Sequence, residues 1–167
     1  VYIGDGTGDF TRVDDAYAAT ETWHGTSVLQ VGDLDGDGDL DAVYTNGDSL
    51  DVDLPHTEDP TEHYGVAWLE NQGKDGWETH EMARHWGAYT PRLVDVDGDC
   101  DLDVVVASLQ DWTAFPFHLE RDTDFADSLP VEPLVWFEND GTGDFTQHSL
   151  PVVEPPYLFG VTVVDLD

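Results

Sequence analysis

The sequence predicts an all-β protein that is built from repeated four-stranded antiparallel sheets. Three observations support this fold class. A nine-residue aspartate-rich segment occurs twice, an aromatic hairpin pattern occurs three times, and no stretch shows the periodicity of a helix. The chain of 167 residues, 40% of them hydrophobic, is long enough to bury a sizeable core.

The aspartate-rich segment reads DLDGDGDLD at Asp33–Asp41 and DVDGDCDLD at Asp95–Asp103, and a third copy opens at Asp165–Asp167. Five carboxylates in nine residues repel one another and destabilise a compact loop unless a cation lies between them. Calcium accepts about 6–8 oxygen ligands in a flexible geometry. The segments therefore predict bound Ca²⁺.

An EF-hand is the best-known alternative for such a loop, and the sequence argues against it. An EF-hand places Gly at position 6 and a bidentate Glu at position 12. Here Cys100 occupies position 6 of the second loop, and position 12 is Tyr44 or Val106. The flanking runs are short and β-branched, so each loop is expected to join two strands.

The predicted ligands follow from the positions of the carboxylates in each copy. In the first loop they are the side chains of Asp33, Asp35, Asp37 and Asp41 with the backbone carbonyl of Asp39. In the second they are Asp95, Asp97, Asp99 and Asp103 with the carbonyl of Asp101, and Asp165 and Asp167 begin a third site. The alternative is a merely solvated acidic turn, which the in-register repeat disfavours.

The second repeated pattern is an aromatic strand, a Gly/Asn/Asp turn and another strand. It occurs at Val1–Thr11, Ala67–Met82 and Val135–Leu150. Glycine-rich turns between such strands indicate β-hairpins. Trp68 and Trp136 occupy equivalent positions 68 residues apart, and both are expected in the core. A period of this length indicates a repeat architecture.

Strands are expected throughout the chain in a regular order. They cover Val1–Ile3, Phe10–Val13, Thr26–Val31, Leu40–Thr45, Gly65–Glu70, Trp77–Met82, Thr90–Val94, Leu102–Ser108, Leu134–Glu138, Phe145–Leu150 and Gly160–Val164. Four antiparallel strands with an aromatic core describe a blade of a β-propeller.

The chain would then hold about two and a half blades: the end of one at 1–25, full blades at 26–89 and 90–159, and the start of another at 160–167. Because propellers have about 4–8 blades, the remaining blades are expected from a longer chain or from other copies.

The segments DLDGDGDLDAV and DVDGDCDLDVVV, followed by WLENQG and WFENDGTGDF, resemble the FG-GAP/VCBS repeats of integrin-α-type β-propellers. This resemblance implies that each aspartate loop joins the first two strands of a blade and holds one calcium ion. Cys100 replaces the second glycine of the usual loop, so the resemblance does not fix the backbone conformation at this position.

Charge limits the partners that the chain can have. The formal net charge is −32, from 37 acidic residues against five Lys and Arg. Nucleic acids and anionic membrane surfaces would be repelled, and no apolar run approaches the roughly 18 residues of a membrane span. We expect no nucleic-acid partner, no membrane insertion and an extracellular location, secreted or at the cell surface. A high-salt environment would also explain the charge.

The predicted functional surface lies opposite the calcium loops. Two long connections, Asn46–Tyr64 and Gln110–Pro133, lie there with the shorter links Asp14–Gly25, Ala83–Tyr89 and Pro151–Phe159, and long loops in compact domains are often functional. The connections and links carry the candidate residues His56, His63, His118, Trp112, Phe115, Phe117, Arg121, Trp23, His24, Arg84, His85, Trp86 and Tyr157.

Three functions are compatible with these features. The first is a non-enzymatic adhesion or ligand-binding module that recognises a glycan or a protein. The second is part of a secreted carbohydrate-active lyase or dehydratase, in which His85 with Arg84, or His118 with Arg121, would supply a base and a cation. The third is a structural repeat of an extracellular assembly. No catalytic motif is visible, so no catalytic residue is assigned.

Overall fold

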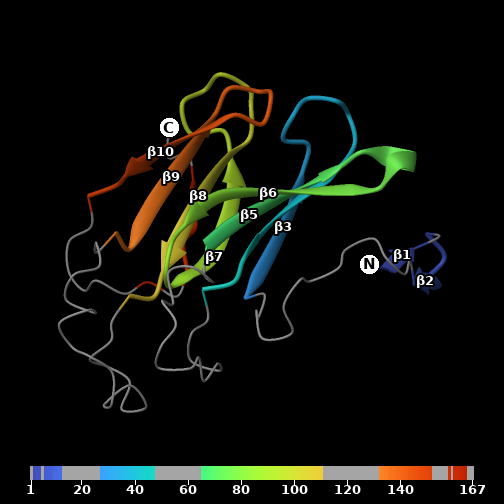
Figure 1. Ribbon diagram of the computed structural model, residues 1–167, viewed down its shortest axis with the longest axis horizontal. Coiled ribbons are helices and arrows are strands. Elements are labelled where there is room, and N and C mark those ends of the chain that lie inside the picture. Colours follow the sequence, from blue (N-terminus) through green and yellow to red (C-terminus); the bar gives the residue numbers. More distant parts are fainter. Residues whose placement is uncertain are drawn as a thin grey trace, which may run out of the picture.

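The computed structural model describes residues 2–4, 6–12, 27–47, 65–110, 132–151, 158 and 160–164. These residues form strands, one short 3₁₀ helix and turns, with no α-helix among them (Figure 1). The strands are β1 (Tyr2–Gly4), β2 (Phe10–Arg12), β3 (Val28–Gly32), β4 (Asp41–Thr45), β5 (Gly65–Asn71), β6 (Trp77–Arg84), β7 (Ala88–Val94), β8 (Asp103–Ser108), β9 (Leu134–Asn139) and β10 (Phe145–Ser149), and the 3₁₀ helix η2 is Gly73–Asp75.

The strands form two four-stranded antiparallel sheets. The first sheet has the order β3-β4-β5-β6 and the second has the order β7-β8-β9-β10, so that each sheet follows the chain. Strands β1 and β2 form a separate two-stranded hairpin. The predicted all-β class and the four-stranded antiparallel sheets are confirmed.

Two details of the predicted element order are wrong. Residues Gly160–Val164, expected to be a strand, adopt no regular structure, because they pair with no strand in the described part of the chain. The link expected at Ala83–Tyr89 is shorter than predicted. Strand β6 continues to Arg84 and β7 begins at Ala88, which leaves a tight turn of residues 85–87 between the sheets.

Strand β8 shows why the β-branched runs form central strands. All six of its residues are buried, because β7 and β9 flank it within the sheet and other parts of the chain cover its faces. Valine suits this position, since a branched side chain packs well on a pleated surface. Strand β9 alternates between half-buried and buried residues, as a strand with two unlike faces should.

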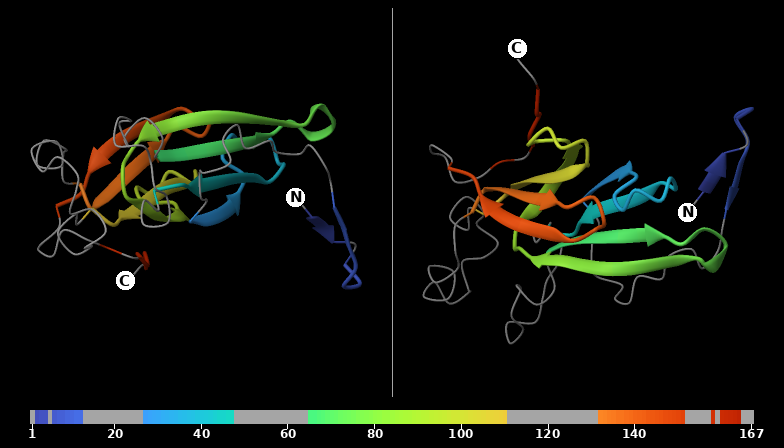
Figure 2. Two further views of the ribbon diagram at one scale, coloured as in Figure 1. Left: turned by 60° about the horizontal axis from the view of Figure 1, so that its bottom comes forward. Right: turned by 90° about the horizontal axis from the view of Figure 1, so that it is seen from above.

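The second sheet packs against the first through its initial strand (Figure 2). Strand β7 lies against β3 and β4. The Thr45 hydroxyl donates a hydrogen bond to the Tyr89 carbonyl at 2.7 Å, and the Gly47 amide donates to the Ala88 carbonyl at 2.9 Å. Backbone and side-chain bonds therefore fix the position of the second sheet on the first.

Trp68 fills the space between the two sheets and is 5% exposed. Its ring meets Phe145 edge to face, with the centroids 6.1 Å apart, and it leaves no room for a side chain at Gly143, whose φ is +81°. The prediction that Trp68 is a core residue is confirmed. Trp136, its equivalent in the second sheet, is only half-buried.

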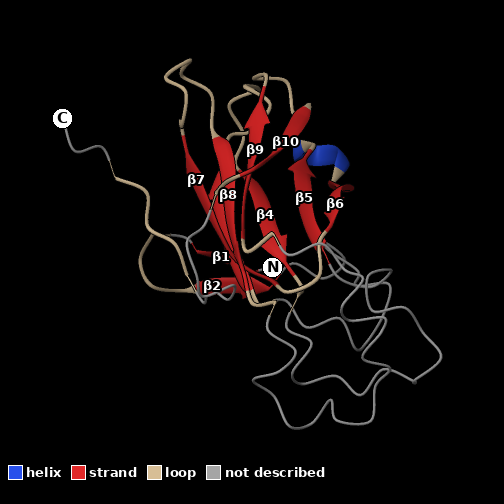
Figure 3. Ribbon diagram, turned by 90° about the vertical axis from the view of Figure 1, so that its left-hand side faces the viewer, coloured by secondary structure: helices blue, strands red, loops and turns tan. Residues whose placement is uncertain are grey.

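The turns within each sheet gather at one end of the molecule (Figure 3). The two aspartate loops follow β3 and β7, and the hairpin turns follow β5 and β9. The residues that connect β4 to β5 and β8 to β9 lie largely outside the described ranges. None of the described helices is long and apolar enough to cross a membrane.

Candidate metal centre

The first aspartate loop is a compact turn in which carboxylates accept hydrogen bonds from backbone amides. The Asp33 carboxylate binds the amides of Gly36 and Gly38 at 2.9 and 3.1 Å. Asp35 and Asp37 each accept the amide two residues further along, at 3.1 and 2.8 Å. These bonds hold the side chains of the loop toward its centre.

The second loop repeats the same bonds in the same register. Asp95 accepts the amides of Gly98 and Cys100 at 2.7 and 3.1 Å. Asp97 and Asp99 again accept the amide two residues further along, at 3.2 and 3.0 Å. Two segments 62 residues apart thus adopt one structure, which indicates a specific loop design and not a generic acidic turn.

The last aspartate of each loop is an anchor in the protein interior. Asp41 is 1% exposed and Asp103 is fully buried. Asp41 accepts the amides of Leu34 and Asn71 at 2.9 and 2.8 Å, so it ties its loop to the neighbouring strand β5. A carboxylate has about four acceptor sites, which leaves this residue able to bind a cation as well.

Asp103 makes the corresponding bonds, from the amides of Val96 and Asn139 at 2.8 and 2.9 Å. Both loops are therefore joined to the third strand of their own sheet. The sequence predicted these two residues as ligands but did not reveal this anchoring role.

The structure brings together three carboxylates in each loop. Oxygen atoms of Asp33, Asp35 and Asp37 lie within 4.8 Å of one another, and so do those of Asp95, Asp97 and Asp99. Asp39 and Asp101, predicted to bind through their carbonyls, lie outside these groups of side chains. The donor sets consist of carboxylate oxygens, which are the ligands that a hard cation such as calcium prefers.

Electrostatics in the loops opposes ionisation. Partial burial is the largest cause that raises the pKa of Asp35 above its ordinary value of 3.8, and the neighbouring charges of Asp41, Asp37 and Glu70 raise it further. The pKa of Asp97 and that of Asp101 are raised for the same two reasons. A bound cation would remove this repulsion, so calcium and protons are expected to compete for the loops.

This competition gives a pH dependence that can be measured in calcium-free protein. A raised carboxyl pKa means that the folded protein holds the proton more tightly than the unfolded chain does. The contribution is therefore a penalty at neutral pH, which disappears as the pH falls through the raised pKa toward 3.8. A double variant, Asp35→Asn with Asp97→Asn, should melt at a higher temperature than the wild type at neutral pH in metal-free buffer.

The advantage of the double variant should shrink as the pH is lowered toward 4. Comparing the two proteins at each pH cancels the effect of groups outside the loops, including His85. A constant difference between their melting temperatures across this range would show that the loop carboxylates are not the source.

The backbone at Cys100 has the conformation of a glycine. Its φ is +82°, close to the +93° of Gly38 at the same position of the first loop. Among the described residues, Cys100 is the single non-glycine residue with a positive φ. A residue with a side chain loses about 1–2 kcal/mol of conformational free energy in this region of backbone angles. The replacement of the second loop glycine therefore leaves the turn intact but strained.

We expect Cys100→Gly to stabilise the protein by about 0.5–1 kcal/mol, because the relief of strain exceeds the extra freedom of the unfolded chain. Chemical denaturation in reducing buffer measures this change, with Cys100→Ser as the control that keeps the strain. Equal stability of the two variants would contradict the assignment of strain to this residue.

Several predicted functional residues lie outside the described ranges. They include Asp165 and Asp167 of the third loop, and the candidates His24, His56, His63, His118, Trp23, Trp112, Phe115, Phe117, Arg121 and Tyr157. The structure therefore gives the geometry of two aspartate loops and of the short link that carries Arg84, His85 and Trp86.

His85 is buried in a polar network and is not available as a surface base. Its Nε2 lies 2.9 Å from the Ser108 hydroxyl and 3.1 Å from the Glu132 carbonyl, and burial lowers its pKa below the ordinary 6.5. Arg84 is exposed and pairs with Glu81 at 3.1 Å. The network fixes the turn between the sheets and shields His85 from solvent.

One group of potential metal ligands was not predicted from the sequence. Glu70, Glu78 and His80 bring their ligand atoms within 4.8 Å of one another on the β5–β6 hairpin. The signal was present, because the hairpin register places these alternate residues on one face of the sheet.

No protein-family model, curated protein or solved structure matches this chain. The resemblance to FG-GAP/VCBS repeats therefore rests only on the two aspartate loops and the aromatic hairpin motifs that follow them.

Proposed function

We propose that this chain is a calcium-stabilised segment of a β-propeller of the FG-GAP/VCBS type. In this proposal, it acts outside the cell as an adhesion or ligand-binding module. The observation that carries the proposal is the identity of the two aspartate loops. Each loop has the same six carboxylate-to-amide bonds and the same cluster of three carboxylates.

The calcium ions have a structural role in this proposal. Each loop joins the first two strands of a sheet and carries carboxylates whose ionisation is opposed by neighbouring charges. Ions that bind the folded loop and not the unfolded chain add their binding free energy to stability. Nothing in the chemistry of the donor set requires a substrate at the ion.

The packing of the sheets supports the propeller. The second sheet meets the first through its initial strand β7, and the two sheets share strand order, loops and hairpin turns. On one face, the first sheet presents a set of cross-strand neighbours to the second sheet, and the second sheet has an equivalent set (here called the row). In the first sheet this row includes Trp68 and His80, and in the second it includes Trp136 and His148. A further sheet placed on that row would extend the same arrangement.

An extracellular location fits the proposed metal. Calcium modules that work outside cells bind the ion with dissociation constants of about 10⁻⁴–10⁻³ M, which suits exposed loops of this kind. The charge of −32 favours cations, neutral glycans or basic proteins as partners and disfavours nucleic acids.

Calorimetric titration with Ca²⁺ tests the metal part of the proposal. Asp35→Asn and Asp97→Asn should each remove one binding event, and the double variant should remove both. Asp75→Asn, on an exposed turn and outside both carboxylate clusters, is the matched control for loss of one negative charge. Calcium binding that is unchanged in the double variant would refute the assignment.

A screen of glycans and extracellular proteins against the calcium-loaded protein tests the binding part. Binding without chemical change supports the adhesion module. Release of an unsaturated sugar product would establish the lyase instead, and polymerisation without a ligand would establish a structural assembly.

A further inference from the structure

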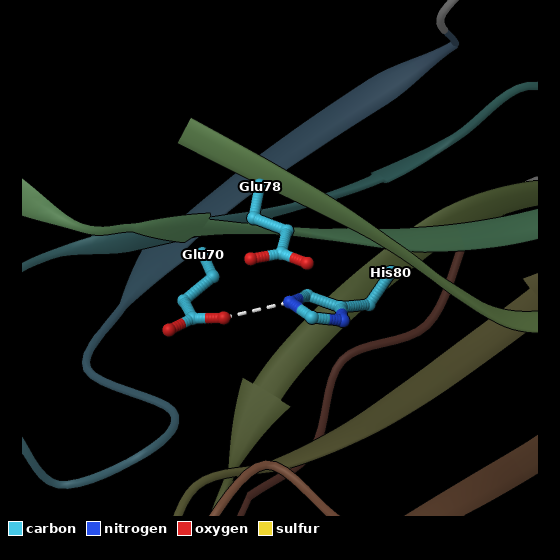
Figure 4. Close-up of side chains that lie close together, drawn as sticks. All are labelled: Glu70, Glu78 and His80. Atoms are coloured by element: carbon cyan, nitrogen blue, oxygen red, sulfur yellow. Dashed lines mark hydrogen bonds and ion pairs between the residues drawn. The ribbon is translucent and has the colours of Figure 1, made fainter. Parts of the chain in front are cut away.

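Three potential metal ligands converge on one face of the β5–β6 hairpin (Figure 4). Glu70 comes from β5, and Glu78 and His80 come from β6. The strand register pairs Glu70 directly with Glu78 and pairs Trp68 with His80. Alternate residues of a strand point to the same face, so these four side chains form a compact square on the sheet.

The imidazole and one carboxylate are already in contact. Nε2 of His80 lies 2.7 Å from Oε2 of Glu70. The side chains remain open to solvent, with 37% of His80 and 24% of Glu70 exposed. An ion could therefore reach the group from solution and keep water molecules in its remaining coordination positions.

Neighbouring side chains orient two of the three ligands. The ring of Trp68 stacks on His80 with the centroids 4.6 Å apart and the planes at 27°. The amide of Gln72 donates a hydrogen bond to Oε2 of Glu78 at 2.7 Å. Such outer contacts fix ring and carboxylate orientation at metal sites, where their loss costs about 10–100-fold in affinity.

The charges at this position call for a cation. Like charges directly opposite one another on antiparallel strands are destabilising, and Glu70 and Glu78 form such a pair. The charge of Glu70 also acts on the first aspartate loop, where it helps to raise the pKa of Asp35. A divalent ion between the two glutamates would neutralise repulsion within the hairpin.

The imidazole separates this group from the calcium loops. Calcium and magnesium select oxygen ligands, whereas imidazole suits zinc, copper and nickel. We infer that Glu70, Glu78 and His80 form a binding site for a transition-metal ion of the Zn²⁺ type, distinct from the aspartate loops. Zinc bonds of about 2.0–2.2 Å require the ligand atoms to lie about 3–3.5 Å apart. Small rotations of the exposed Glu78 side chain provide this adjustment.

The second sheet offers an internal comparison for this site. Nε2 of His148 lies 2.7 Å from Oε2 of Glu138, and the His148 ring stacks on Trp136 at 4.7 Å. Thr146, however, occupies the position opposite Glu138. The second sheet thus has the same two-ligand pair without the third ligand, and the inference predicts tight binding in the first sheet alone.

The test is titration of the full, calcium-saturated chain with Zn²⁺ by calorimetry, together with NMR of the histidine rings. In the wild type, Zn²⁺ should shift the ring signals of His80 at concentrations that leave those of His148 unchanged. Glu78→Thr, which copies the second sheet, should weaken binding at this site by at least about tenfold. Thr146→Glu should create a second site and shift His148 as well.

Retention of a cooperative melting transition shows that each variant is folded. If Glu78→Thr does not fold, the ring shifts of the wild type and the gain of a site in Thr146→Glu still decide the question. Zinc binding that leaves the His80 ring unshifted would overturn the inference. So would displacement of the zinc by calcium alone, because it would place the ion in the aspartate loops.

Discussion

Removal of calcium is expected to lower the melting temperature of this protein by roughly 10–20 °C. An ion that binds only the folded state adds about 2.7 kcal/mol when its free concentration is 100 times its dissociation constant. Two equivalent loops therefore add about 5 kcal/mol, and each kcal/mol shifts the transition of a chain of this size by about 2–4 °C. Thermal unfolding with saturating Ca²⁺ and with excess chelator measures the difference.

Single-loop variants divide this effect between the two sites. Asp35→Ala or Asp97→Ala should abolish about half of the calcium-dependent shift, because each variant disables one loop and leaves the other intact. Magnesium at the same concentration is the control for ionic strength and should restore little, since Mg²⁺ demands a smaller, octahedral site. A melting temperature that is the same with calcium and with chelator would contradict structural calcium.

The strands were predictable because local signals agreed with their tertiary environment. The run of valines in β8 is buried on both sides, and the alternation in β9 matches its two unlike faces. The aspartate loops were predictable for the same reason, since their spacing lets the first three carboxylates accept hydrogen bonds from amides two to five residues further along. Gly160–Val164 resembled a strand in composition, but composition does not supply a partner strand.

Features that depend on contacts between the sheets could not be predicted from the sequence. Asp41 and Asp103 looked like ordinary ligands of a loop, and only the structure shows that they are buried and tied to strands 30 and 36 residues further along. His85 was a candidate base on a predicted surface link, but its position in the tight turn between the sheets buries it against Ser108. In each case the determining contact joins residues that no local pattern relates.

Asn139 is the clearest of these long-range contacts, and its replacement is expected to destabilise the protein strongly. Its side-chain amide donates to the carbonyl of Leu34 at 2.7 Å, across the interface between the sheets, and to that of Leu102 at 3.0 Å. Its side-chain oxygen accepts the amides of Gly141 and Gly143, each at 3.2 Å. Because the residue is 1% exposed, water cannot replace these bonds. Asn139→Ala should cost about 2–4 kcal/mol.

Asn71 is the matched control, because it occupies the same position in the first sheet without reaching a second sheet. Its side chain donates to Leu40 at 3.2 Å and accepts the amide of Gly73 at 3.1 Å, both at exposed sites. Asn71→Ala should therefore cost less than about 1 kcal/mol.

Leu34 lies within the first aspartate loop, so Asn139→Ala should also weaken calcium binding there. Asn71→Ala removes an exposed bond to Leu40 of the same loop and should weaken calcium binding less. Chemical denaturation and calcium titration of both variants measure these effects. Equal losses of stability in the two variants would mean that the bond across the interface adds nothing. If the bond between the sheets contributes to stability, Asn139→Ala must cost more than Asn71→Ala. Of these two asparagines, only Asn139 joins its own sheet to the aspartate loop of the other sheet.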